Sequence, residues 1–192
     1  MKRIEELAQR FRTAIEKAAE AGEADELNFF SRYPVGCCGD ASDLLAEFFF
    51  ANGIIAKYVC GTCYHNNEMQ SHAWLLVDDT VIVDITGDQF KFNPIYYNFD
   101  RRVYVGASNK FYELFEVDSL RDIHGYSSTA LSTYRLKKLY STIIKYLPKA
   151  SLDSIIDDAK NRARKHNIKK KENDDEHYRE IKFPEYYNNG AR

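Results

Sequence analysis

Apolar residues recur at intervals of three and four positions near the start of the chain, which predicts a first helix over residues 2–21. A second, apolar run with helical spacing follows Cys37 and Cys38 and ends at an Asn-Gly pair, a combination typical of a helix C-terminus. Between them, residues 23–37 show no sustained period and contain a proline and a glycine, so we expect a connector. The apolar positions of the two helices are Ile4, Leu7, Ala8, Phe11, Ile15 and Ala18, then Leu44, Leu45, Phe48 and Phe49.

Five runs rich in β-branched and aromatic residues follow the second helix, separated by polar or glycine-containing turns. Such runs predict the strands of an antiparallel sheet. Because helices precede and follow them, the expected fold class is α+β, with the cysteine-led helix packed on the sheet. The runs cover residues 54–61, 72–77, 80–85, 102–106 and 111–117.

Helical spacing returns in the last third of the chain. It begins near Ser127 and ends at Pro148, and a last helix is expected from Ser151, whose hydroxyl can cap it. Blocks of charge follow His166, with little to bury, and predict a mobile or partner-dependent tail. We therefore expect three parts: a core over residues 1–125, helices packed on that core over residues 126–167, and a charged tail over residues 168–192.

Composition narrows the function classes. The chain has 192 residues, of which 44% are hydrophobic and 29% charged, as expected for a folded protein. A formal net charge of -2 disfavours nucleic acid as the main partner. No signal-peptide pattern and no long apolar run is present, so we expect a cytoplasmic protein without a membrane span. In that compartment the four cysteines are expected to be free thiols, metal ligands or catalytic groups.

The position of two cysteines at a helix start predicts a nucleophile. A thiol there faces unpaired N–H groups and the positive end of the helix dipole, which favour the thiolate. Acyl transfer by a thiolate also needs an imidazole and a group that orients it. His72 opens the strand "HAWLLV", and Asp84 lies near the end of the following strand, so these two residues are the candidates.

The number of residues in the loop between these two strands decides which of their side chains share a face. If the connecting loop has an odd number of residues, the apolar set Ala73, Leu75, Val77, Val81, Val83 and Ile85 shares one face. The same register places His72 and Asp84 together on the other face, directly opposite or diagonal to each other. A two-residue turn at Asp78-Asp79 would separate them. The continuous apolar face favours the odd loop.

The motifs "GCCGDAS", "SHAWL" and "DITGDQF", in this order, resemble the transglutaminase-like cysteine protease superfamily over roughly residues 30–92. The resemblance implies a papain-like, transglutaminase-like catalytic core with Cys38 as nucleophile, His72 as base and Asp84 as the group that orients the imidazole. The resemblance aligns Cys38 with the cysteine of the family pattern and places Cys37 at a variable position of that pattern. It does not distinguish a peptidase from a deamidase, an acyltransferase or a transglutaminase.

Two other interpretations compete with this one. Cys60 and Cys63 form a C-x-x-C with His65 nearby, and with Cys37 or Cys38 they could hold structural zinc. Alternatively, the chain is a non-catalytic interaction module whose basic C-terminal residues bind an acidic partner. Those basic residues are Lys137, Lys138, Arg162, Arg164 and Lys165.

Individual residues also have structural alternatives. Cys38 could be a packing residue and His72 a hydrogen-bonded strand histidine. Asp84, between two apolar residues, requires a partner of some kind because burial of a lone carboxylate is costly. Asp88 and Gln89 follow the strand in turn-forming positions.

We expect a cysteine-nucleophile amide hydrolase or acyltransferase that acts on a peptide or protein. In this interpretation Cys38, His72 and Asp84 act together, and the backbone N–H of Cys38 forms half of an oxyanion hole. No metal and no organic cofactor is required. A protein partner is possible for the C-terminal tail.

Overall fold

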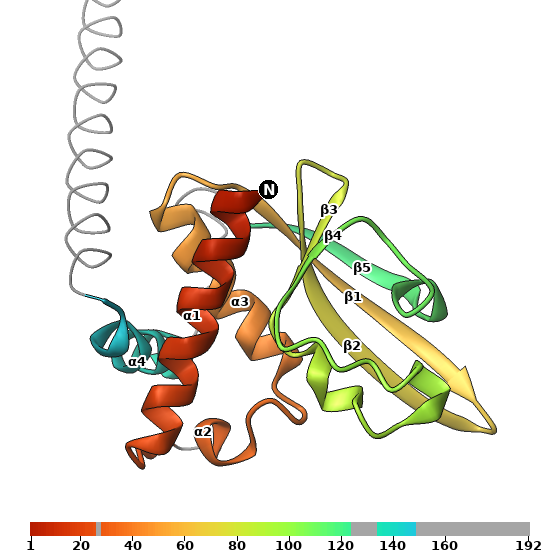
Figure 1. Cartoon of the computed structure of the whole chain (residues 1–192), viewed down its shortest axis with the longest axis horizontal. Coiled ribbons are helices and arrows are strands. Elements are labelled where there is room, and N and C mark those ends of the chain that lie inside the picture. The colour runs from red at the N-terminus through yellow and green to blue at the C-terminus, as the bar shows by residue number, and fades with distance from the viewer. Residues whose placement is uncertain (26–27, 124–133, 149–192) are drawn as a thin grey trace, which may run out of the picture.

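The computed structural model describes residues 1–25, 28–123 and 134–148. Its fold is α+β, with helices on one side of a five-stranded sheet (Figure 1). The helix expected from Ser151 and the charged tail lie outside the described residues. Among the described residues, no helix has the length and apolar character needed to cross a membrane.

The sheet is antiparallel throughout, as the sequence predicts, and its strand order is β4-β3-β2-β1-β5. One predicted strand is wrong. Residues 111–117 contain the 3-10 helix Tyr112–Leu114, and the strand begins only at Glu116. The helical turn brings Phe111, Tyr112 and Phe115 into one aromatic cluster, whereas a strand would alternate them between faces. The strands are β1 Ala56–His65, β2 Glu68–Val77, β3 Val81–Asp84, β4 Tyr104–Gly106 and β5 Glu116–Ile123.

Three helices form the layer on one side of the sheet. Helix α3 (Cys38–Ala51) contacts β1 and β2, while α1 (Lys2–Glu20) packs beside α3 (Figure 1). Helix α4 (Tyr134–Ile143) buries its apolar side in the same core. The predicted connector is wrong over α2 (Phe29–Arg32), a short helix that forms because its two phenylalanines are buried in this core.

The other face of the sheet carries a separate aromatic core. Trp74 and Ile82 point into it, whereas Leu75 and Val83 point toward the helices. This division confirms the alternation predicted for the hairpin. The segment between β3 and β5 supplies most of the rings on this face, and its short helices are η1 (Gly87–Phe90), η2 (Pro94–Tyr96) and η3 (Tyr112–Leu114).

The loop between β2 and β3 has odd length, as predicted. Val77 pairs with Val81, so three residues, Asp78 to Thr80, connect the strands. Asp78 and Asp79 adopt left-handed conformations, with φ of 50° and 57°. Aspartate tolerates this conformation better than most residues, so the local sequence supports the turn.

Candidate active site

Cys38 is the first residue of α3, and Cys37 is its N-cap. Gly36, at φ 64°, turns the chain into the helix from a conformation that favours glycine. The Cys37 side chain is buried and its Sγ lies 3.7 Å from the carbonyl oxygen of Phe29. Cys38 is partly exposed. The two neighbouring thiols therefore occupy different environments.

These environments shift the pKa values of the two thiols in opposite directions. Burial raises the pKa of Cys37 to about 11. Burial also opposes ionisation of Cys38, but a hydrogen bond and the charge of His72, with a backbone hydrogen bond from Ala73, lower its pKa below the ordinary value. Strand β3 pairs with β2 only over Leu75–Val77. Ala73 lies beyond this β2–β3 pairing, so its backbone can form a hydrogen bond with the Cys38 thiol. Of these two thiols, Cys38 therefore ionises more readily.

His72 is completely buried and meets Cys38 from the sheet side. Its Nε2 lies 2.8 Å from Asp84 Oδ2, and its ring contacts four aromatic side chains. Burial alone would lower the pKa of His72, but Asp84 and then Cys38 raise it to about 9. The imidazolium is thus stabilised inside an apolar enclosure. The enclosing rings belong to Trp74, Phe90, Phe111 and Phe115.

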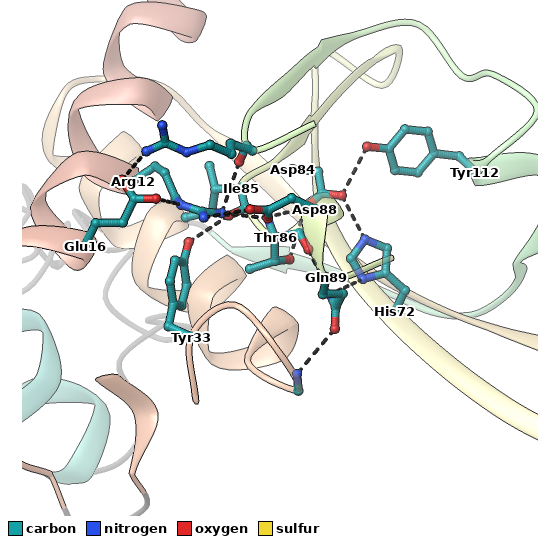
Figure 2. Close-up of polar contacts among 12 residues, drawn as sticks. Arg12, Glu16, Tyr33, His72, Asp84, Ile85, Thr86, Asp88, Gln89 and Tyr112 are labelled. Atoms are coloured by element: carbon teal, nitrogen blue, oxygen red, sulfur yellow. Dashed lines mark hydrogen bonds and ion pairs between the residues drawn. The ribbon is translucent and has the colours of Figure 1, made fainter. Parts of the chain in front are cut away.

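Asp84 is buried and surrounded by donors (Figure 2). Its Oδ1 accepts hydrogen bonds from the backbone N–H of Thr86 at 2.8 Å and from Thr86 Oγ1 at 3.1 Å. Its Oδ2 faces His72 and also accepts a hydrogen bond from Tyr112 Oη at 3.1 Å. Burial raises the pKa of Asp84, yet the charge of His72 and the hydrogen bonds from His72 and Thr86 outweigh burial and lower the pKa.

Gln89 links the cysteine loop to the histidine. Its Oε1 accepts from the backbone N–H of Gly36 at 3.3 Å, and its Nε2 donates to the carbonyl of Thr86 at 3.0 Å. These two contacts fix the orientation of the amide. Nε2 consequently lies 3.3 Å from His72 Nδ1, on the side of the ring opposite Asp84 (Figure 2).

Arg12 anchors the loop that follows β3. From within α1, its guanidinium makes a two-pronged ion pair with Asp88, with both N–O distances 2.9 Å, and donates to the carbonyl of Ile85 at 2.6 Å. Tyr33 Oη donates to the same carbonyl at 2.7 Å. A charged network therefore holds the segment that carries Asp84 and Gln89.

The residues predicted for zinc do not converge. Cys63 lies in the aromatic core, whereas Cys60, an odd number of positions away on β1, faces the opposite side of the sheet. Among the residues that the structure describes, no group of three or more His, Cys, Asp or Glu side chains could hold a metal ion. The zinc interpretation thus has no ligand set in this part of the chain.

Two residues of the site escaped the sequence analysis. Arg12 could have been identified from the sequence, because it lies next to Phe11 on the apolar side of a predicted helix. A charged residue at such a position requires a buried partner. Tyr112 could not have been identified in this way, because its segment resembled a strand. The structure brings Cys38, His72 and Asp84 together, and it adds Gln89, Arg12 and Tyr112 around them.

The chain is similar to a known protein family. A family model described as the transglutaminase-like superfamily matches residues 2–97. The matched range includes Cys38, His72 and Asp84, and ends before Tyr112. No curated protein and no solved structure matches the chain.

Proposed function

The chain belongs to the transglutaminase-like superfamily, and from this premise we propose that it is an amide hydrolase or acyltransferase that uses Cys38 as nucleophile. The observation that carries the proposal is the contact of Cys38 with a buried histidine–carboxylate pair, His72 and Asp84, which also lowers the pKa of Cys38 below its ordinary value. The proposed substrate is an amide in a peptide or protein, and the proposed core is papain-like. Peptidase, deamidase and transglutaminase-like activities all use this chemistry.

In the proposed reaction the Cys38 thiolate attacks the amide carbonyl and forms a tetrahedral intermediate. The His72 imidazolium then donates its proton to the leaving nitrogen, the C–N bond breaks, and a thioester remains on Cys38. A water molecule or a second amine attacks the thioester while neutral His72 accepts its proton. Thiolate and product are released, and the ion pair is restored.

The surroundings support a division of roles. Asp84 holds the imidazole by Nε2, which leaves Nδ1 for the proton transfer. The backbone N–H of Cys38 is proposed as one oxyanion donor, since the first N–H groups of a helix have no partner within it. His72 is fully buried and Cys38 is partly exposed, so a substrate reaches the pair from the Cys38 side.

A panel of peptide aldehydes and activated acyl esters tests the proposal by intact-protein mass. We expect a single adduct on the full-length chain, retained in Cys37→Ala and lost in Cys38→Ala. Hydroxylamine should release the acyl adduct, as expected for a thioester, and the accepted side chains would define the substrate class. No adduct with any member of the panel, or an adduct that persists in Cys38→Ala, would overturn the proposal.

A further inference from the structure

Tyr112 makes a polar contact that the candidate triad does not account for. The residue is 3% exposed, and its Oη donates to Asp84 Oδ2, the same oxygen that faces His72 Nε2. Its ring is fixed on several sides by other rings, at centroid distances between 4.9 and 5.7 Å. Those rings belong to Trp74, Phe99, Tyr104 and Phe111. A side chain held this firmly can direct the hydroxyl to one acceptor.

The hydroxyl of Tyr112 remains a donor at every working pH. Burial, and next the negative charge of Asp84, raise the pKa of Tyr112 well above the ordinary value. The group therefore cannot become a phenolate beside the carboxylate. A hydrogen bond from a neutral donor favours the ionised form of a carboxylate.

Close packing confines the Asp84 carboxylate on the side of Gly87. A Cβ at Gly87 would lie 3.0 Å from Asp84 Oδ2 and 2.6 Å from Phe99 Cε1. Asp84 is therefore closely packed on the side of Gly87 and Phe99. Loss of the Tyr112 hydroxyl would leave Oδ2 of a buried carboxylate with one donor fewer.

We propose that Tyr112 is a positioning residue, whose hydroxyl keeps the Asp84 carboxylate ionised and directed at His72. The inference rests on the proposed function only for its catalytic consequence, because the contact itself is a property of the fold. Tyr112 lies beyond residues 2–97, which the family model matches. The segment between β4 and β5 therefore adds a hydroxyl group to the site from outside the matched range.

The groups that face this pair come from several elements. His72 on β2 and Cys38 on α3 interact electrostatically with Asp84, as does Tyr33. Tyr104 on β4 interacts with Tyr112. Arg12 and Asp88 form their own pair on the α1 side of the loop. His72 is the cation that contacts Asp84 directly, so removal of the Tyr112 hydroxyl acts mainly through this pair.

The test compares Tyr112→Phe with Tyr104→Phe in the full-length chain. Tyr104 belongs to the same aromatic cluster, but its Oη donates at 2.6 Å to the carbonyl of Ala107 and not to Asp84. The first measurement is the rate of Cys38 carboxamidomethylation against pH. In Tyr112→Phe we expect the acid-side midpoint to rise by about one pH unit, because Asp84 becomes easier to protonate. Tyr104→Phe should retain the wild-type profile.

A second measurement does not depend on the thiol. The ring resonances of His72 in NMR spectra follow the protonation of Asp84, and their acid-side midpoint should rise in Tyr112→Phe by the same amount. If Tyr112→Phe does not fold, 3-fluorotyrosine at position 112 provides a stronger donor and should move the midpoint down. Wild-type midpoints in both measurements would overturn the inference. An unreactive Cys38 in the wild type would instead overturn the proposed function, and the His72 resonances would still decide the role of Tyr112.

Discussion

His72 Nε2 lies 2.8 Å from Asp84 Oδ2, although the two residues are not directly opposite each other in the hairpin. The register Leu75↔Val83, continued along the strands, places Trp74 opposite Asp84, and His72 lies two positions beyond Trp74 on β2. The contact is therefore diagonal, on one face of the sheet. It depends on the parity of the loop that joins β2 and β3.

Loop parity gives the first prediction. Deletion of Thr80 shortens the connection from three residues to two, so every side chain of β3 moves to the other face of the sheet and Asp84 no longer shares a face with His72. We expect a lower midpoint of urea unfolding and loss of the preferential reactivity of Cys38.

A matched control adds two residues to the same loop. Insertion of Asn-Gly after Asp79 lengthens the loop but preserves its parity, and longer surface loops cost little free energy. This variant should keep the Cys38 reactivity of the wild type. Equal behaviour of the deletion and the insertion would contradict the role assigned to parity.

The second prediction distinguishes the two adjacent cysteines. Limited iodoacetamide at about pH 6 should modify Cys38 before the others, because only a thiol of lowered pKa is substantially ionised there. Cys37, whose pKa is raised to about 11, and Cys60, whose pKa burial also raises, should react slowly. Peptide mapping by mass spectrometry measures the order.

Replacement of His72 provides the control for this labelling. His72→Gln removes the hydrogen bond and charge that lower the pKa of Cys38, so the preference should disappear. Cys37→Ala should retain it. Labelling of Cys37 first in the wild type would show that the nucleophile is assigned to the wrong thiol.

Alternating patterns explain why so much of this site could be predicted from sequence. The two faces of the hairpin follow from six apolar positions, and the start of α3 follows from the glycine and the apolar run around the cysteines. Both are local properties with a fixed period. They were sufficient to place His72 and Asp84 on one face.

The parts that were missed depend on distant contacts. The segment Phe111–Phe115 contains residues typical of a strand, but burial against Trp74 and His72 favours a helical turn. Arg12 meets Asp88 across 76 positions of sequence, so its partner could not be identified from α1 alone. Tertiary packing decided both.

The third prediction concerns that buried pair. Asp88→Asn removes the negative charge from a guanidinium that is only 5% exposed, and loss of one partner of a buried pair typically costs about 3 kcal/mol. The free energy of urea unfolding should fall by about this amount. Asp79→Asn is the matched control, because Asp79 pairs with Lys57 at the surface, where ion pairs contribute little to stability. Similar losses in both variants would contradict the anchoring role of Arg12.

The fourth prediction follows from the raised pKa of His72. A group whose pKa is higher in the folded state contributes stability that is complete below its unfolded pKa, about 6.5, and is lost as the pH rises through the folded value. For His72 that folded value is about 9, and the first cause that raises it is the charge of Asp84. The contribution of His72 should therefore be full near pH 6 and absent near pH 10.

Cys38→Ser serves as the background, because it removes the titration of the thiol itself and leaves Asp84 in place. The difference in free energy of unfolding between Cys38→Ser and Cys38→Ser/His72→Gln should shrink from pH 6 to pH 10, because the share of the raised pKa of His72 that comes from Asp84 is lost over this range. Titration of the lysines and of the tyrosines affects both proteins and cancels in the difference. A difference that stays constant, or that grows as the pH rises, would mean that Asp84 does not hold His72 in its charged form.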